Sequence, residues 1–161
     1  MSFEEYVAQQ GHALLRLAFV LTGDAELAKD LTQTALIRAY RNWRKVVRAQ
    51  NPDAYVRRIL VNTQLDWARR RSSTEEPHAF DSHQGDIAPD PADGVSQRAY
   101  TRELLTRLTP RARTVLVLRY YADLDDVAIA DLMGISTGAV RAAASRALAK
   151  LRDSRNLLEN R

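Results

Sequence analysis

Three polar residues near the carboxyl end of the 161-residue chain, Thr137, Arg141 and Ser145, are spaced four apart. This spacing places side chains on one face of an α-helix. The planar fork of arginine can donate two parallel hydrogen bonds to guanine in the major groove, and hydroxyl groups can bond to any base. Arg146 and Lys150 flank this face. The pattern is typical of a helix that reads double-stranded DNA.

The residues around this face predict a helix-turn-helix. A short helix, DVAIADLM, is expected after a cap at Asp125 or Asp126, and Gly134 can adopt the left-handed conformation that a tight turn demands. Ser136 then caps a longer helix. The apolar face of that helix is expected to comprise Val140, Ala143, Ala144, Ala147 and Leu151. An ordinary helical hairpin is the alternative, but the cap, the turn and the basic outer face together favour DNA binding.

A second polar stripe recurs at intervals of three and four residues earlier in the chain. Its members are Tyr55, Arg58, Asn62, Asp66 and Arg69. Arginine suits phosphate, asparagine suits base edges and an aromatic ring suits base stacking, so the stripe is compatible with single-stranded nucleic acid. A solvated helix face is the alternative, and the stripe alone does not exclude it.

Residue combinations for catalysis or metal binding are missing from the sequence. The chain has no cysteine, no HExxH motif, no phosphate-binding glycine loop and no recognisable nucleophile–base pair. We therefore expect no enzyme, no cofactor and no metal site. The absence of cysteine fits a reducing cytoplasm, and no apolar run approaches the roughly 20 residues that a membrane span needs. We expect a cytoplasmic protein without membrane insertion.

The elements that position these stripes are all predicted to be helices. Three are expected in the N-terminal part: one from a Ser2–Glu5 capping box to Gly23, one capped by Asp24, and one from Pro52 to about Arg71. The apolar stripe of the second helix is expected to be Leu27, Leu31, Leu36, Tyr40, Trp43 and Val47.

Four helices are expected in the C-terminal part. Ser96 begins the first, Thr109 and Pro110 begin the second, and the helix-turn-helix supplies the remaining two. The core face of the second helix is expected to comprise Val115, Leu116, Leu118 and Tyr121.

Between these two parts lies a segment rich in Pro, Gly, Ser and Asp that shows no apolar periodicity. It contains six acids and no Lys or Arg: Glu75, Glu76, Asp81, Asp86, Asp90 and Asp93. The whole chain carries a net charge of +4, so the two flanking parts are basic and attract polyanions. The sequence thus predicts an all-α protein of two small helical modules, residues 1–72 and 96–161, joined by a flexible acidic linker, residues 73–95. The C-terminal module is a helix-turn-helix.

Residues 28–34, AKDLTQT, carry a resemblance to a known family. The run is similar to the A-E-D-L-x-Q-E segment of extracytoplasmic-function sigma factors, the smallest members of the sigma-70 family. Asp30, Leu31 and Gln33 match, whereas Lys29 and Thr34 replace two glutamates. In that family this run binds the clamp helices of RNA polymerase, so the resemblance implies core-polymerase binding by the three matching residues.

The resemblance continues through both modules. Residues 51–55, with Arg57, Arg58, Asn62 and Asp66, resemble the segment that reads the melted −10 promoter element. The −10 residues expected on this stripe are Tyr55, Arg58, Asn62, Asp66 and Arg69. Residues 108–111 and 134–141 resemble the module for the duplex −35 element, with Ala139 where threonine is usual. The −35 residues implied are Ser136, Thr137, Arg141, Ser145 and Arg146.

The expected function is therefore a sigma factor that binds core RNA polymerase and directs promoter-specific initiation. Family members are often held inactive by an anti-sigma factor, which would be a further partner. The alternative is a classical helix-turn-helix regulator that binds duplex operators without polymerase. Such a regulator needs neither the 28–34 run nor the polar stripe on the third helix.

Overall fold

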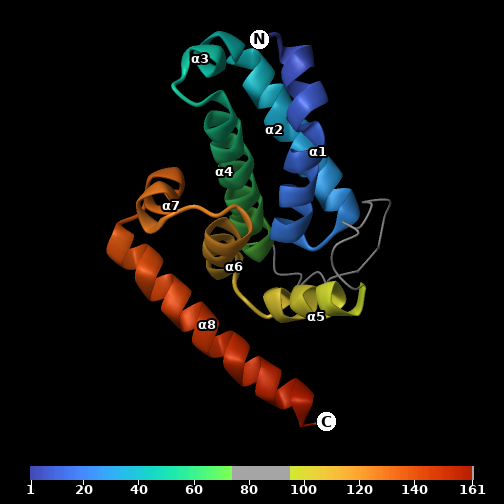
Figure 1. Ribbon diagram of the computed structural model, residues 1–161, viewed down its shortest axis with the longest axis vertical. Coiled ribbons are helices and arrows are strands. Elements are labelled where there is room, and N and C mark those ends of the chain that lie inside the picture. Colours follow the sequence, from blue (N-terminus) through green and yellow to red (C-terminus); the bar gives the residue numbers. More distant parts are fainter. Residues whose placement is uncertain (74–94, 161) are drawn as a thin grey trace. The chain divides into compact units, whose positions relative to one another are not determined.

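The computed structural model describes residues 1–73 and 95–160 of the chain, which divides into two compact units, Met1–Gly85 and Asp86–Arg161 (Figure 1). Within the described ranges every regular element is a helix, so the all-α prediction is confirmed. Residues 74–94 of the expected acidic linker lie outside the described residues.

Over residues 1–73 the first unit contains four helices: α1 (Phe3–Thr22), α2 (Ala25–Arg41), α3 (Trp43–Arg48) and α4 (Pro52–Ser73). Their starting points follow from local capping. Ser2 and Glu5 form the predicted capping box, Asp24 accepts a hydrogen bond from the Leu27 amide at 3.0 Å, and Asn51 accepts one from the Ala54 amide at 3.1 Å.

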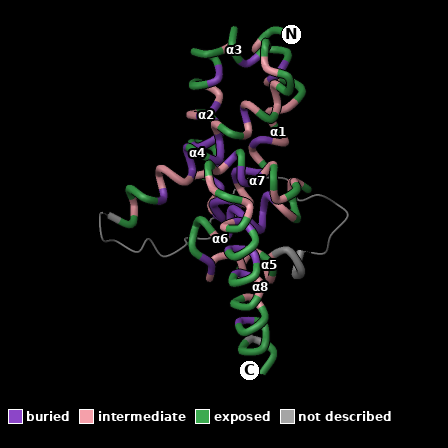
Figure 2. Tube along the Cα trace, turned by 90° about the vertical axis from the view of Figure 1, so that its left-hand side faces the viewer, coloured by how far each residue is buried: buried purple, intermediate pink, exposed green. Residues whose placement is uncertain are grey.

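Helix α2 packs against both α1 and α4, which makes it the central element of this unit (Figure 1). Its buried face is mostly alanine: Ala25, Ala28, Ala35 and Ala39, together with Leu31 and Thr32. Small side chains let neighbouring helices approach closely, and most of the larger core residues come from α1 and α4. Figure 2 shows the buried residues along the inner sides of these helices, with exposed residues on their outer sides.

The second predicted helix was expected to run on to Val47, and this expectation is wrong. Asn42 leaves the helical conformation (φ −114°, ψ 24°), and its side-chain amide donates to the Arg38 carbonyl at 3.1 Å. Asparagine competes for backbone groups in this way and so favours helix ends. The chain restarts as the short helix α3, and Val47 is exposed there. Tyr40, also expected in the core, is 61% exposed, and its ring packs edge-on against the Phe3 ring at a centroid distance of 5.0 Å.

A buried hydroxyl ties the start of α1 to the start of α4. The Tyr6 side chain is almost fully buried, and its hydroxyl donates to Asp53 Oδ1 at 2.8 Å. Arg57 holds the other oxygen of Asp53 at 3.0 Å. Burial raises the pKa of Tyr6 above its ordinary value, and the hydrogen bond to Asp53 adds to that rise. The hydroxyl therefore keeps its proton and remains a donor.

The second unit contains α5 (Val95–Thr106), α6 (Pro110–Leu116), the π-helix η1 (Val117–Tyr121), α7 (Asp126–Met133) and α8 (Thr137–Glu159). Helix α5 begins one residue before Ser96, which was expected to open it. Thr109 caps α6 as predicted, accepting from the Ala112 amide at 3.2 Å. The buried Arg113 donates from Nε to the Leu105 carbonyl at 3.0 Å and so joins α6 to the end of α5.

The π-helix η1 corrects the predicted core of this unit. The Ala122 amide bonds to the Val117 carbonyl, five residues earlier, instead of four as in an α-helix. The extra residue in this turn rotates Tyr121 away from the side that Leu118 occupies. Tyr121 was expected in the core but is 50% exposed, and Val117 is buried in its place.

Helices α7 and α8 are bent by 104° relative to each other. Within the described ranges no single helix is long and apolar enough to cross a membrane, and α7 and α8 pass that test only as this bent pair.

The Tyr6 hydrogen bond gives a stability prediction. Tyr6→Phe keeps the ring but removes the donor to Asp53, so we expect a loss of about 1–2 kcal/mol in the free energy of unfolding. Urea denaturation followed by circular dichroism measures this loss. Tyr120→Phe is the control, because Tyr120 is exposed and its change should stay within about 0.5 kcal/mol. Equal midpoints for both variants would contradict the proposed link between α1 and α4.

Candidate nucleic-acid and protein interfaces

The turn between α7 and α8 has the geometry of a helix-turn-helix. Gly134 ends α7 in the left-handed region (φ 68°), and its amide bonds to the Ala130 carbonyl. Ser136 then begins α8, accepting a hydrogen bond from the Ala139 amide at 3.0 Å. The predicted cap, turn and second cap are all confirmed. Together they direct the first turns of α8 outward from the unit, as in helix-turn-helix proteins.

Helix α8 has one buried face and one exposed face over these turns. Val140, Ala143, Ala144 and Ala147 are buried against the rest of the unit. Ser136, Arg141, Ser145 and Arg146 are exposed, and Thr137 is half-buried. At about 100° per residue, Thr137, Arg141 and Ser145 share one outer face, whereas Arg146 stands roughly 140° around the helix from Arg141. The structure thus brings the first three together and separates Arg146 from them.

Arg141 is not isolated on this face. Its Nε lies 3.4 Å from Asp126 Oδ2, and the same carboxylate accepts bonds from Arg119 Nη2 at 2.9 and 3.0 Å. Asp126 comes directly after the Asp125 cap of α7, and Arg119 belongs to the π-helix. From the sequence, Asp126 was expected only as a possible cap. Because Asp125 already caps α7, the second acid at Asp126 is not needed as a cap, and this is the sequence signal for another partner.

The polar stripe on α4 is only partly exposed. Arg58, Asn62 and Arg69 are exposed, and Asp66 is partly exposed, 3.5 Å from Arg69 Nη2 and 3.2 Å from Arg70 Nη2. Tyr55 was expected to lie on the same surface, but its ring is half-buried against the cluster around Tyr6 and Val56. An unstacked base could therefore reach only part of the Tyr55 ring. The exposed stripe consists of guanidinium and amide groups.

Arg71, next to this stripe, is partly buried at the end of α4. Burial lowers the pKa of its guanidinium, and the carboxylate of Asp24 acts in the opposite direction. The last turn of α4 is thereby linked electrostatically to the start of α2.

The outer face of α2 carries only part of the 28–34 run, because Ala28, Leu31 and Thr32 are buried. Asp30 and Gln33 are exposed there, whereas Leu31 is fully buried in the core. Leu31, which the resemblance implies as a partner contact, therefore packs α2 into the core and is not exposed on the outer face in this fold. Ile37 and Tyr40, four and seven residues after Gln33, are exposed on the same side. They were not identified from the sequence, because Tyr40 was assigned to the core.

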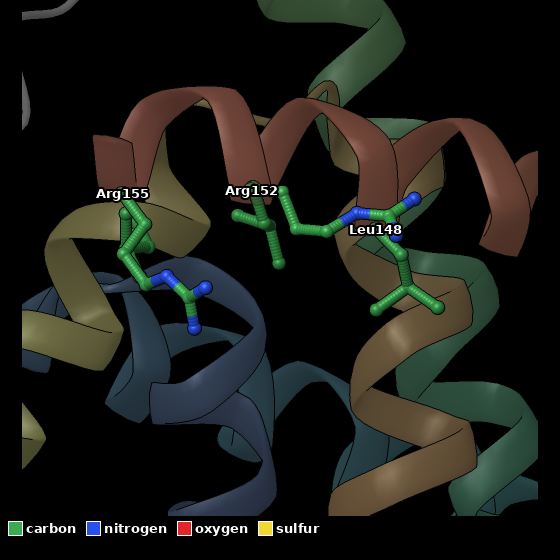
Figure 3. A pocket seen from close by; sticks show the side chains of 5 residues that line it. Leu148, Arg152 and Arg155 are labelled. Carbon is green, nitrogen blue, oxygen red and sulfur yellow. The ribbon is translucent and has the colours of Figure 1, made fainter. Parts of the chain in front are cut away.

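A groove of about 330 Å³ lies between α5 and α8 in the second unit (Figure 3). It is lined by Leu104, Leu148, Leu151, Arg152 and Arg155. Figure 3 shows the side chains of Leu148, Arg152 and Arg155 projecting from one side of α8. The leucines of this groove follow the ordinary helical spacing of a core, so the sequence pattern does not distinguish them from buried residues.

Two protein-family models match the chain in the same order as its two units. The model described as Sigma-70 region 2 matches residues 7–74, which include α2 and α4. The model described as Sigma-70, region 4 matches residues 104–153, which include the helix-turn-helix.

Relatives match almost the full chain. The RNA polymerase sigma-E factor of Streptomyces avermitilis is 38% identical over 95% of this chain and 84% of its own length. The ECF RNA polymerase sigma factor SigE of Mycolicibacterium smegmatis is 30% identical over 94% of this chain and 61% of its own length. The chain belongs to the extracytoplasmic-function group of the sigma-70 family.

Solved structures share the fold of this sigma-family chain at lower identity. The sigma factor RpoE, in a complex with the anti-sigma factor NepR from Bartonella quintana, matches with a TM-score of 0.75 and 21% identity over 94% of each chain. CnrH, solved with the cytosolic domain of CnrY, matches with a TM-score of 0.63 and 22% identity over 96% of this chain and 88% of that chain.

Two glycines of the helix-turn-helix, Gly134 and Gly138, are predicted to respond oppositely to substitution by alanine. In Gly134→Ala the added Cβ would meet no atom within 4 Å, but the alanine would have to adopt the left-handed φ. Because that conformation is strained for alanine, we expect a loss of about 1–2 kcal/mol in the free energy of unfolding. Gly138→Ala lies inside α8 with only the Ser136 hydroxyl 3.9 Å away, so a gain of about 0.5–1 kcal/mol is expected. Urea melts of the two variants measure both signs. A loss at Gly138 equal to that at Gly134 would contradict the conformational argument.

Proposed function

We propose that this chain binds core RNA polymerase through the outer face of α2 and directs it to promoters. In this proposal the first turns of α8 read the duplex −35 element. The exposed stripe on α4 binds the melted −10 element. Residues 1–72 and 96–161 are assigned as the two functional modules, and residues 73–95 as the linker between them.

The observation that supports this proposal best is the presence of two unrelated exposed faces in one chain. The α8 face carries hydroxyl and guanidinium groups suited to DNA, whereas the α2 face carries an acid, an amide and exposed apolar groups suited to a protein partner. A classical regulator that acts without polymerase needs only the first. Run-off transcription with core polymerase on genomic fragments tests the proposal directly, because polymerase alone should give no specific start.

The partners follow from this reaction. They are core RNA polymerase, promoter DNA and, by analogy with RpoE bound to NepR, an anti-sigma factor. We assign the protein to the cytoplasm, where polymerase transcribes, and give its own residues a binding role with no catalytic one.

The first prediction concerns the α2 face. Asp30→Arg reverses an exposed charge that we assign to the polymerase contact, which should cost on the order of 2–5 kcal/mol of binding. We expect co-purification with core polymerase to be lost while the circular dichroism melt stays unchanged. Glu4→Arg makes the same charge change on the exposed start of α1 and should retain binding. Full binding by the Asp30 variant would remove α2 from the interface.

The second prediction concerns Arg141. Its side chain is 70% exposed, so Arg141→Ala opens no cavity. We expect a loss of about 1–3 kcal/mol of discrimination at one −35 base pair, the usual contribution of a bidentate arginine–guanine contact. Arg141→Lys should restore charge but only part of the discrimination.

The measurement is a binding series over −35 variants at fixed salt. Lys150→Ala is the matched control, because Lys150, which was expected to flank the reading face, is instead exposed roughly 180° around α8 from Arg141. It removes the same charge and should change no base preference. An equal loss of affinity for every −35 variant in Arg141→Ala would identify a phosphate contact instead of a base contact.

A further inference from the structure

The carboxylate of Asp126 lies between two guanidinium groups from different helices. Arg119 Nη2 contacts both of its oxygens, at 2.9 and 3.0 Å, and Arg141 Nε contacts Oδ2 at 3.4 Å. The Asp126 side chain is only 18% exposed, and that of Arg119 is 30% exposed. The Arg119–Asp126 pair is therefore a partly desolvated contact, and Arg141 is the exposed member on the outer surface.

The backbone on both sides of this pair is held firmly. Arg119 lies in the π-helix, whose last turn closes with the Ala122 amide on the Val117 carbonyl at 3.0 Å. Asp126 lies in the first turn of α7, directly after the Asp125 cap. Since both residues are fixed by regular structure, the carboxylate has a defined position relative to α8, which packs on α7.

The contact uses the one nitrogen of Arg141 that guanine reading does not require. An arginine can donate to O6 and N7 of guanine with its two terminal amino groups. Its Nε is then available to a protein carboxylate. A carboxylate at Nε limits the rotation of a long side chain that otherwise samples many rotamers, and it sets the plane of the guanidinium.

We propose that Asp126 is a positioning residue for −35 recognition: it orients the guanidinium of Arg141 for base reading and is itself held by Arg119. This inference rests on the proposed function, because it takes Arg141 to be the base-reading residue. It adds two residues to the DNA-reading machinery that contact no base themselves.

The geometry favours positioning over competition between Asp126 and DNA. Arg119 already pairs its full positive charge with the carboxylate through two short contacts. The attraction of Asp126 for Arg141 is therefore too weak to keep Arg141 from binding DNA. The Arg141 contact is the longer one, and the Arg141 side chain remains 70% exposed. The group of three carries one net positive charge, which suits a surface facing phosphates.

Asp126→Asn tests this inference, since it keeps the shape of the side chain and removes its charge. The holoenzyme is assembled from the full chain and core RNA polymerase, and its preferred −35 sequence is selected from randomised duplexes. Competition binding over single-base-pair variants then gives discrimination at each position. We expect discrimination at the Arg141 base pair to fall about threefold to tenfold. Affinity for all sequences should rise, because a negative charge near phosphates is removed.

Asp153→Asn is the matched control. Asp153 is exposed further along α8, so the substitution makes the same charge change. It should leave base discrimination unchanged. In the double variant Asp126→Asn with Arg141→Ala, discrimination should equal that of Arg141→Ala alone, because a positioning residue has no effect without the residue that it positions.

Unchanged or increased discrimination in Asp126→Asn, with Arg141→Ala still losing it, would overturn the positioning role alone. Equal weakening of all sequences by Arg141→Ala would overturn both the base-reading role and the positioning role. If Asp126→Asn lowers the melting temperature, Arg119→Lys replaces it, because lysine keeps the charge but lacks the planar guanidinium whose Nη2 contacts both oxygens of Asp126. Discrimination should then fall about twofold to fivefold, and full retention would overturn the inference.

Discussion

The direction of α8 depends on a single residue in the left-handed region. Gly134 ends α7 at φ 68°, and the 104° bend that follows allows α7 to pack across the start of α8. A residue with a side chain would strain this conformation, although nothing within 4 Å would obstruct the added atom. The constraint is thus conformational. Because Val140 and Ala144 are then buried, the exposed position of Arg141 is fixed by the same turn.

In the first unit, the inner face of α2 consists mostly of small alanine side chains, whereas its outer face exposes varied polar and apolar side chains. Alanines at 25, 28, 35 and 39 pack against α1 and α4 without large side chains. The exposed residues of the outer face are then not needed to pack this unit. The residues that match the family run therefore divide between the two faces. Leu31 packs in the core, whereas Asp30 and Gln33 are exposed and accessible to a partner.

Capping was predictable from the sequence because it is local. Ser2, Asp24, Thr109 and Ser136 each bond to an amide three residues away, and the sequence contains both partners. Two of the errors arose where a helix ends or where its number of residues per turn changes. Extending one periodic stripe past Asn42 placed Val47 in the core, and a constant 3.6-residue turn through the π-helix did the same for Tyr121. No residue type announces a five-residue backbone bond, since the pattern VLRYY fits either helix.

The Asp126 cluster could not be predicted for a related reason. Its three residues come from three helices, so the sequence spacing between 119, 126 and 141 does not indicate that their side chains meet. Their meeting depends on the π-turn, which sets where Arg119 points, and on the Gly134 turn, which returns α8 past α7. An acid near a DNA-binding surface repels phosphate unless it is over-compensated. Two arginines around one aspartate meet that requirement, so an acid can orient a reading side chain while the surface stays positive.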